Sequence, residues 1–389
     1  MNHCQLPILP TTELKKSEVV LRRSHIVLAW IMHFYVRTIP PGEPVRIPPP
    51  ITIPLLQVSN HLQLPPVLTY SDDVLYNWKS KSSTPRDIPD LYDLQCHTLF
   101  TGTRDEEEFY LSSARIELRG VEALSLMRST MDELFVGDEI AVKRITNYLT
   151  RLATVINDLT SLLMAVREGC DPEVFYHEIR PWFKGADSDG EPWVFEGLDR
   201  EEAQGLEIPT ELSGPSAGQS SLIHALDIFL GVHEYSHSSS ITGAESSTSA
   251  SSSPSSSAAT PASDAKKSFL DRMRLYMPRH HRNFLGHLAS SQRPLRQFVL
   301  NNTTSQEGSA LLDAYNRVVI ALKEFRDKHI VIVTLYIIGP ARRAAQLDSG
   351  TEGVKEGKEE LKGTGGTNLA RFLKDVRDGT KGAALDRVL

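Results

Sequence analysis

Residues 314–338 read Ala314-Tyr-Asn-Arg-Val-Val-Ile-Ala-Leu-Lys-Glu-Phe-Arg-Asp-Lys-His-Ile-Val-Ile-Val-Thr-Leu-Tyr-Ile-Ile338 and carry the pattern of a long helix. Side chains at spacings of three and four form one apolar stripe, which consists of Val318, Leu322, Phe325, His329, Ile332 and Tyr336. The stripe therefore places an imidazole on the face that should meet the core. A neutral imidazole in a core needs a partner. His329 is either a core histidine bonded to a carbonyl, which the stripe alone favours, or an axial ligand to a buried haem.

Composition sets outer limits on the class of protein. The chain has 389 residues, of which 40% are hydrophobic, enough for one large domain or two with a real core. A net charge of -7 gives no electrostatic footprint for nucleic acid or an anionic membrane. The most apolar early run, Ile26–Val36, is too short to span a membrane and is interpreted as a buried helix.

Cysteine usage points to an intracellular protein. The three cysteines, Cys4, Cys96 and Cys170, lie far apart and form no CxxC pair. Neither a disulfide framework nor a thiolate metal site is indicated. We therefore expect a soluble, cytoplasmic protein.

The first two thirds of the chain predict a proline-rich strap followed by a helical bundle. Residues 39–66 are rich in proline, and because consecutive prolines disfavour helix, we expect an extended strap there. From about Ser113 to Arg167 the pattern becomes helical over three stretches. One apolar face is formed by Leu149, Leu152, Val155, Ile156, Leu159, Leu162 and Leu163.

Two later segments lack the apolar periodicity of a packed element. Residues 236–263 are almost entirely Ser, Ala, Thr, Pro and Gly, which predicts a disordered surface loop. Residues 342–362 alternate Gly, Glu and Lys, and with the Gly363–Thr367 run they predict a mobile loop over 342–367. A closing helix is expected after it, with Leu369, Phe372, Leu373 and Val376 on its apolar face.

The expected fold is all-α because few segments alternate with period two. We predict a remnant of a small domain with the proline-rich strap over residues 1–66. A large helical-bundle domain should follow over residues 67–389.

One short motif matches a zinc site. His233-Glu-Tyr-Ser-His237 has the HExxH spacing, which puts two imidazoles and a general base on one helical face. The preceding helix, expected over residues 222–232, ends as the motif begins, and His237 opens the serine-rich tract. A third ligand at a suitable spacing is also missing. A polar, frayed helix end is therefore favoured over a zinc hydrolase.

Two further segments have a bland and a functional interpretation. In Gly363-Thr-Gly-Gly-Thr367 the glycines let the backbone approach a ligand closely, although a flexible linker that caps the last helix explains them equally well. In Phe175-Tyr-His-Glu-Ile-Arg180, the arginine could clamp a carboxylate while Phe175 and Tyr176 stack on a flat ring. Taken singly, an arginine lying over packed aromatics is the simpler interpretation.

Together and in this order, these segments resemble the indoleamine 2,3-dioxygenase family of haem enzymes. The resemblance runs from about His25 to Val376. Its landmarks are Leu64-Pro-Pro-Val-Leu-Thr-Tyr-Ser-Asp-Asp-Val-Leu-Tyr-Asn-Trp78, Phe175-Tyr-His-Glu-Ile-Arg180, Pro215-Ser-Ala-Gly-Gln-Ser-Ser221, Arg274-Leu-Tyr-Met-Pro-Arg-His-His-Arg-Asn-Phe-Leu285, Phe325-Arg-Asp-Lys-His329 and Lys362-Gly-Thr-Gly-Gly-Thr367. Residues 1–23 show no resemblance, so we expect an amino-terminally shortened member of the family.

The resemblance implies a haem b cofactor. His329 matches the proximal ligand of the haem iron, and Arg326 matches the residue that pairs with a haem propionate. Asp227 matches a position near that arginine. The fold implied is a large helical haem domain.

The resemblance also implies a distal pocket for an indole amino acid. Ser113 matches the serine beside the indole ring, Phe175 an aromatic packed on the substrate, and Arg180 the clamp on its carboxylate. Further substrate-binding positions implied are Tyr70, Phe109, Tyr176, Ala217, Gly218 and Thr364, the last on the mobile loop. Tyr176 stands where the family has a second phenylalanine.

The activity implied is insertion of dioxygen across the indole C2–C3 bond of L-tryptophan to give N-formylkynurenine, the first step of the kynurenine pathway. A haem-binding paralogue with weak or altered activity is the alternative, and a zinc hydrolase using residues 233–237 is a distant one. The sister tryptophan 2,3-dioxygenases use a distal histidine, and Ser113 at the matching place argues against them. A monomer without nucleic-acid or membrane partners is expected.

Overall fold

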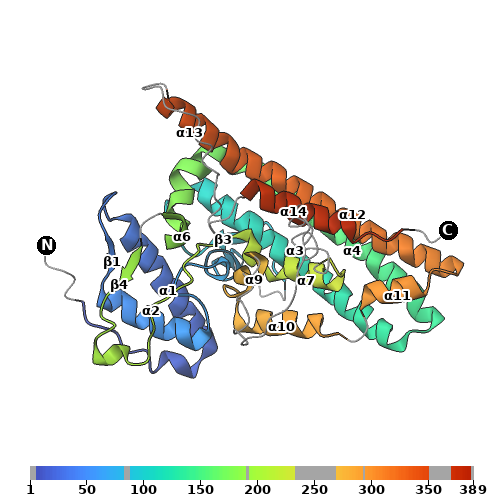
Figure 1. Ribbon diagram of the computed structural model, residues 1–389, viewed down its shortest axis with the longest axis horizontal. Helices are drawn as coiled ribbons and strands as arrows, with labels where there is room; N and C mark the ends of the chain where they lie inside the picture. Colours follow the sequence, from blue (N-terminus) through green and yellow to red (C-terminus); the bar gives the residue numbers. More distant parts are fainter. Residues whose placement is uncertain are drawn as a thin grey trace, which may run out of the picture.

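Three long helices, α3 (Arg104–Val136), α4 (Glu139–Ala165) and α12 (Gln306–Val333), form the framework of the larger part of the molecule (Figure 1). The computed structural model describes residues 6–82, 88–189, 192–232, 269–291, 294–349 and 369–386. Within these ranges α4 packs against both α3 and α12. The prediction of an all-α fold is confirmed, since the strands there are four three-residue segments.

Polar side chains set where these helices begin. Thr103 accepts a hydrogen bond from the Glu106 amide at the start of α3, and Asp138 accepts one from the Ala141 amide at the start of α4. Between them Gly137 takes a positive φ of 70°, which ends α3 and turns the chain back. The three helical stretches expected from Ser113 are in fact two helices, and the first begins earlier, at Arg104.

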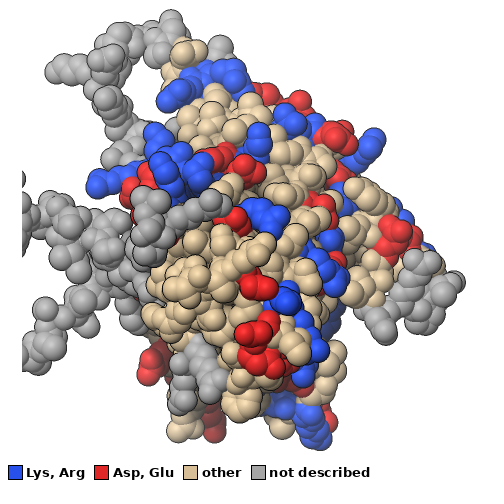
Figure 2. Space-filling view, turned by 90° about the vertical axis from the view of Figure 1, so that its right-hand side faces the viewer, with Lys and Arg blue, Asp and Glu red and all other residues tan. Residues whose placement is uncertain are grey.

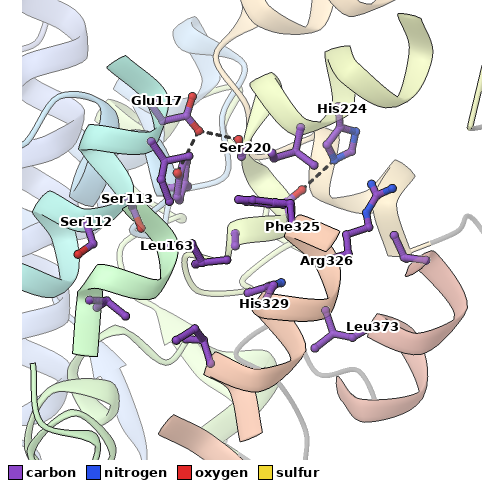
Figure 3. A pocket seen from close by; sticks show the side chains of 18 of the residues that line it. Ser112, Ser113, Glu117, Leu163, Ser220, His224, Phe325, Arg326, His329 and Leu373 are labelled. Carbon is purple, nitrogen blue, oxygen red and sulfur yellow. Dashed lines mark hydrogen bonds between the residues drawn. The ribbon is translucent and has the colours of Figure 1, made fainter. Parts of the chain in front are cut away.

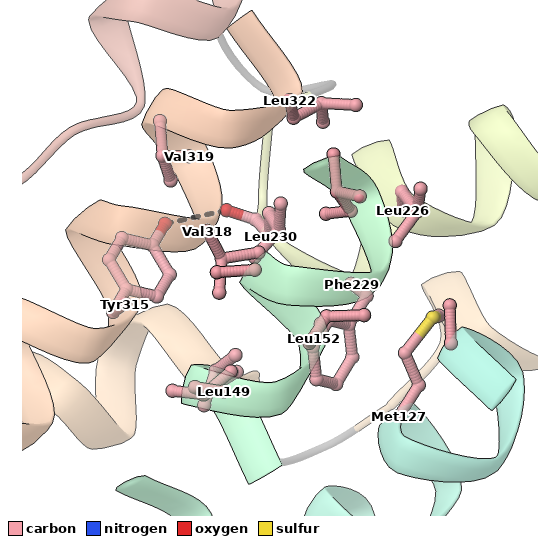
Figure 4. Packing of buried hydrophobic residues seen from close by; sticks show 14 of the residues in the cluster. Met127, Leu149, Leu152, Leu226, Phe229, Leu230, Tyr315, Val318, Val319 and Leu322 are labelled. Atoms are coloured by element: carbon pink, nitrogen blue, oxygen red, sulfur yellow. Dashed lines mark hydrogen bonds between the residues drawn. The ribbon is translucent and has the colours of Figure 1, made fainter. Parts of the chain in front are cut away.

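The core of the bundle is aliphatic. The short helix α7 (Ser221–Phe229) packs on α3, and its Leu226 and Phe229 point into the core shared with α4 and α12 (Figure 4). Tyr315 is fully buried there, and its hydroxyl donates a 2.7 Å hydrogen bond to the Leu230 carbonyl oxygen. This bond ties α12 to the end of α7, which fixes the two elements that later carry site residues.

The amino-terminal part corrects one expectation. Helix α1 (Glu18–Arg37) is half buried along its length, as the apolar run predicts, and α2 (Pro49–Leu62) follows it. The extended strap expected over 39–66 is wrong for its second half, which is this helix. Prolines at the first two positions of a helix lack N–H groups that would have no intrahelical acceptor, so they start α2 rather than prevent it. Only Pro54 lies inside the helix.

A second, aromatic core joins this amino-terminal part to the rest. Trp30 of α1 stacks on Phe100 with ring centroids 4.0 Å apart, and Phe100 stacks on Trp182 at 5.4 Å. Strand β1 (Val45–Ile47) pairs in parallel with β4 (Trp193–Phe195). Contacts of this kind link residues on the two sides of residue 66. The division of the chain into two domains at that residue stays a prediction.

The remaining elements are short. They are β2 (Trp78–Ser80) paired antiparallel with β3 (Leu94–Cys96), α5 (Pro172–Val174), α6 (Ala186–Asp189), α9 (Phe269–Arg274), α10 (Arg279–Ala289) and α11 (Leu295–Asn301), with 3₁₀ turns η1 (Leu14–Lys16), η3 (Val166–Glu168), η5 (Arg180–Phe183), η6 (Glu201–Ala203) and η7 (Ala217–Gln219). Single π-helical turns are η2 (Ser71–Leu75), η4 (Phe175–Ile179) and η8 (Thr334–Ile338).

The carboxyl-terminal part is more helical than expected. α12 continues through η8 into α13 (Gly339–Ser349), so the mobile loop expected from residue 342 is wrong up to Ser349. The closing helix is confirmed as α14 (Leu369–Gly382), which packs on α12. The rest of the predicted loop, the serine-rich tract and the HExxH motif fall outside the described residues.

One helical run in the described part of the chain, Glu139–Glu168, is long and apolar enough to cross a membrane. Its apolar side packs between α3 and α12, as a core helix does. On the face in Figure 2, positive and negative side chains are mixed, and neither sign forms a continuous field. This distribution is typical of a solvent-exposed surface.

Candidate active site

A cavity lies between α3, α4, α7, α12 and α14 (Figure 3). Its wall is largely apolar. The hydrophobic lining consists of Phe109, Ile116, Leu163, Val166, Ile223, Leu270, Phe325, Ile332, Phe372, Leu373 and Val376. A lining of this character suits a flat apolar group.

The His329 imidazole projects from α12 into this cavity (Figure 3). Other side chains cover the imidazole only partly, because one side of it borders the open space of the cavity. Burial lowers the pKa of His329 to about 4, helped by the nearby positive charge of Arg326, so the ring is neutral near pH 7. Within the described part of the chain no hydrogen bond to this ring is made, so it is not a core histidine bonded to a carbonyl. A neutral imidazole with a free nitrogen is what a metal requires of a histidine ligand.

A buried ion pair borders the same side of the cavity. Arg326 Nη2 donates to both carboxylate oxygens of Asp227, at 2.7 and 2.6 Å, and Nη1 donates to the Thr380 hydroxyl. The three residues come from α12, α7 and α14, so the pair joins the helices on three sides of the cavity. Because Arg326 lines the wall, its positive charge can also attract an anionic group inside.

His224 of α7 fastens the small-residue turn that forms another part of the wall. Its Nε2 donates to the Gly218 carbonyl oxygen at 2.9 Å, and Arg274 Nε donates to its Nδ1 at 3.4 Å. Burial lowers the pKa of His224. A Cβ at Gly218 would lie 3.2 Å from Phe269 and 3.3 Å from Met273, so those two side chains would have to shift slightly to admit it.

A buried carboxylate closes the end of the cavity formed by α3. Glu117 Oε1 accepts hydrogen bonds from the Tyr70 hydroxyl at 3.0 Å and from the Ser220 hydroxyl at 2.6 Å. Burial raises the pKa of Glu117, while these two hydrogen bonds act in the opposite direction. Tyr70 is also held by its backbone amide, which donates to the Gln219 side chain.

Most of the residues predicted for the site line this one cavity. These are Tyr70, Phe109, Ser113, Ala217, Gly218, Asp227, Arg326 and His329. Thr364 lies outside the described residues. The roles assigned to all of these positions stay predictions.

Phe175, Tyr176 and Arg180 are not among the described residues that line the cavity. The Phe175 ring contacts Phe109 at 4.4 Å and Tyr336 at 5.6 Å between centroids, and both of those residues line the cavity. Arg180 is buried, with its guanidinium 5.5 Å from the centre of the Tyr176 ring, as the simpler interpretation had it. Burial lowers the pKa of Arg180.

Sequence reasoning missed Glu117 and His224. Glu117 follows Ser113 by four residues, a spacing that puts both on one face of a helix, but Arg115 and Arg119 around it suggest a solvated surface. His224 lies three residues before Asp227 and could have been found from the same turn of helix. Neither had a recognisable motif.

Comparison with known proteins places the chain in a family. The family model for indoleamine 2,3-dioxygenase matches residues 2–383. The chain belongs to the indoleamine 2,3-dioxygenase family. Its match includes the first residues, so the expectation that residues 1–23 show no resemblance is wrong.

Individual relatives agree with the family. The chain is 35% identical to the indoleamine 2,3-dioxygenase of Saccharomyces cerevisiae, over 94% of this chain and 78% of the yeast protein. It is 30% identical to indoleamine 2,3-dioxygenase 1 of Rattus norvegicus, over 98% of this chain and 84% of the rat protein. It is also 29% identical to the 6-hydroxytryptophan 2,3-dioxygenase of Fusarium equiseti, over 96% and 83% of the two chains.

Indoleamine 2,3-dioxygenases are haem enzymes, and the residues around this cavity suit a haem. The site offers one unbonded neutral imidazole, apolar walls and an arginine at the margin. Among the described residues no cluster of three His, Cys, Asp or Glu side chains could hold a bare metal ion. The residues present therefore fit a haem, which brings most of its own ligands to the iron and would take one further ligand from the protein.

Proposed function

We propose that the protein is a haem-dependent dioxygenase that adds both oxygen atoms of O2 across the indole C2–C3 bond of L-tryptophan to give N-formylkynurenine. The observation that carries the proposal is His329, a neutral imidazole without a described hydrogen bond that projects into a large apolar cavity. Membership of the indoleamine 2,3-dioxygenase family supports the same activity. Haem b is the proposed cofactor and His329 its proximal ligand.

The protein's own contribution is to bind, orient and exclude water. Haem, when bound, supplies the activation of dioxygen. His329 would hold the iron from α12, and the Arg326 guanidinium, already fixed by Asp227, would balance the charge of a haem propionate. The apolar lining would keep water away from the reacting atoms and orient the indole.

The substrate side is proposed to lie along α3. Ser113, Phe109 and Tyr70 give that wall two aromatic rings and two hydroxyls. Phe175 supports Phe109 from behind. The clamp on the substrate carboxylate is assigned to Arg180, with Tyr176 beside it and Thr364 of the following loop closing on the amino acid.

Replacing Arg180 tests the clamp. Arg180→Ala should lower kcat/KM for tryptophan by the equivalent of about 2–5 kcal/mol, the usual effect of removing one partner of a buried charged contact. The haem absorbance should stay at the wild-type level, because the haem contacts are assigned to His329 and Arg326. Arg343→Ala, which removes an exposed arginine paired with Glu173, is the control. Parallel loss of haem and turnover would contradict the assignment.

The ultraviolet–visible spectrum of the protein expressed with haem tests the function itself. Wild type should show a Soret band and form N-formylkynurenine from tryptophan under reducing conditions. His329→Ala should lose the band, whereas His224→Ala, which removes another imidazole from the same cavity, should keep it. A band that survives His329→Ala but is lost in His224→Ala would move the ligand assignment to His224.

A haem enzyme of the same class with altered activity is the second candidate. Two observations favour it: Tyr176 and Arg180 are not among the described residues that line the cavity, and one relative is named for 6-hydroxytryptophan. Assays with tryptophan and 6-hydroxytryptophan in parallel separate the candidates. The substrate with the higher kcat/KM identifies the activity.

We also propose that the enzyme is a cytoplasmic monomer without nucleic-acid or membrane partners. The net charge of -7 and the packing of the apolar run Glu139–Glu168 inside the core support this. Size-exclusion chromatography with light scattering checks the monomer. A dimer mass at low concentration would contradict it.

A further inference from the structure

Glu117 lies where two hollows of the molecule meet. Its side chain lines the active-site cavity and also a groove on the other side, between α3 and α10. It extends from α3 one helical turn after Ser113 (Figure 3). The roles proposed above for the cavity do not use this carboxylate.

The two hydrogen bonds to Glu117 fix the direction of two hydroxyl groups. Tyr70 and Ser220 each have one hydroxyl hydrogen, and both hydrogens point to Glu117 Oε1, at oxygen–oxygen distances of 3.0 and 2.6 Å. Both hydroxyl oxygens can then offer only lone pairs to a ligand. Oε1 accepts in this way whether or not Oε2 carries a proton.

Two other polar side chains of the cavity wall have donors that are already occupied. The His224 Nε2 hydrogen is bound to the Gly218 carbonyl, and Arg326 donates to Asp227 and Thr380. The Ser112 and Ser113 hydroxyls also line the cavity, about one turn before Glu117 on α3. Next to Glu117 itself, the Tyr70 and Ser220 oxygens therefore present hydrogen-bond acceptors in otherwise apolar surroundings.

We propose that Glu117 is a positioning residue that makes this end of the cavity an acceptor site for a hydrogen-bond donor on the ring of the substrate. The proposal rests on the function proposed above and narrows its substrate class to flat aromatic amino acids with such a donor. The donor is either the indole N–H or a hydroxyl on the indole ring. An acceptor left without a donor in an apolar site is costly, so ligands without the donor are rejected.

A purely structural role for Glu117 would have different consequences. The same bonds join α3 to the Tyr70 segment and to the start of α7, so their loss would loosen the cavity for every ligand alike. Loss of an acceptor site instead weakens donor-bearing ligands selectively. The ratio of affinities between matched ligands separates these roles.

Two matched ligand pairs measure the ratio on the haem-loaded protein. Tryptophan against β-(3-benzothienyl)alanine replaces the ring N–H by sulfur, and 6-hydroxytryptophan against 6-methoxytryptophan replaces the O–H by O–CH₃. Each dissociation constant is taken from the change in the Soret band. In wild type at least one pair should differ by roughly tenfold, as one well-formed hydrogen bond allows. The pair that differs identifies the donor.

Three variants then locate the cause. Glu117→Leu should bring that ratio close to one, because the Tyr70 and Ser220 hydrogens are free to turn into the cavity. Glu117→Gln keeps one carbonyl oxygen for both hydroxyls and should retain the ratio. Tyr70→Phe, which removes one acceptor, should lower the ratio and replaces Glu117→Leu if that variant does not fold.

Two results would overturn the proposal: ratios near one for both pairs in wild type, or an unchanged ratio in Glu117→Leu and Tyr70→Phe. Either result together with normal product formation leaves the dioxygenase assignment intact. Should no Soret band form, the proposed function fails, and the hydroxyl placement is tested on the haem-free protein by ultraviolet titration of the Tyr70 phenol. Glu117→Leu should lower the pKa of that phenol, with Tyr70→Phe identifying its signal, and no change would refute the placement.

Discussion

At the residue scale, Asp227 and Arg326 form the pair with the largest expected effect on stability. Asp227→Ala would leave a guanidinium buried without its counter-charge, at a cost of about 3–5 kcal/mol in the free energy of unfolding. The control is Asp327→Ala on the same helix as Arg326, whose partners Lys323 and Arg377 are partly exposed, so that change should cost about 1 kcal/mol or less. Urea unfolding of both variants measures the difference. Equal effects of the two substitutions would contradict the account.

The buried imidazole of His33 should make the free energy of unfolding depend on pH. Its Nδ1 donates to the Trp182 carbonyl and its Nε2 accepts from the Leu68 amide, and burial lowers the pKa of His33 to about 4. The unfolded chain takes up this proton near pH 6.5, whereas the native protein does not until about pH 4. Stability is therefore retained above pH 6.5 and falls as the pH drops towards 4, by up to about 3 kcal/mol.

The measurement is the free energy of unfolding between pH 4 and pH 7 for wild type and His33→Gln, since contributions of other groups cancel in the difference. The variant should be less stable at neutral pH but lose less on acidification. His177→Gln is the control, because that imidazole is exposed beside Glu173. Parallel pH curves for wild type and His33→Gln would show that His33 is not the acid-sensitive group.

The site residues fall into three groups: those predicted from a sequence pattern, those found through resemblance and those that were missed. The apolar stripe predicted that His329 faces inward, and the structure agrees, but spacing could not tell a cavity from a packed core. Ser113, Tyr70 and Gly218 were found through resemblance alone, since one serine or glycine has no periodic signal. Glu117 and His224 escaped notice because their function depends on partners 103 and 6 residues away, respectively.

At the element scale, Gly308 shows how a helix start constrains its sequence. Its amide donates to the Ser305 hydroxyl at 3.0 Å, in the first turn of α12. A Cβ at Gly308 would overlap the carbonyl of Asn302, which belongs to the turn from α11. Gly308→Ala should therefore destabilise the protein by about 1–3 kcal/mol, as overpacking does.

The matched control is Gly286, inside α10, where a Cβ would have nothing within 4 Å. Alanine favours a helix over glycine by about 1 kcal/mol, so Gly286→Ala should raise the melting temperature. Thermal denaturation of both variants shows whether their melting temperatures shift in opposite directions. Stabilisation by Gly308→Ala would mean that the α11–α12 turn opens without cost.

The repeat of apolar residues and the positions of prolines explain which helices were predicted from the sequence and which were not. α3, α4 and α12 repeat apolar residues over many turns, so their type was clear from sequence. α2 was missed because its prolines were interpreted as helix breakers, although two of them occupy the first turn. The π turn η4 was also beyond prediction, because its extra residue per turn is set by the packing of Phe175 against Tyr336 and Phe109.

At the scale of the whole molecule, the aromatic core decides whether the amino-terminal part is independent. Trp30 of α1 contacts Phe100 and Tyr110, and Tyr110 lies on α3 directly after the cavity residue Phe109. The apolar surface of α1 is thus buried against the element that forms the substrate wall. Neither part can lose its structure without exposing the core of the other.

We therefore expect the described parts of the chain to unfold in one cooperative transition. Trp30→Ala should lower the free energy of unfolding by about 3–5 kcal/mol and shift that single transition, without creating a second one. Phe135→Ala, at a site where the ring is 76% exposed at the α3–α4 corner, should leave it within about 0.5 kcal/mol. Hydrogen exchange should show the slowest amides of α1 and α3 opening at the same free energy, because both depend on the same buried rings. An earlier transition confined to α1 and α2 would instead make residues 1–66 a separate domain. The stability of the substrate wall would then not depend on α1.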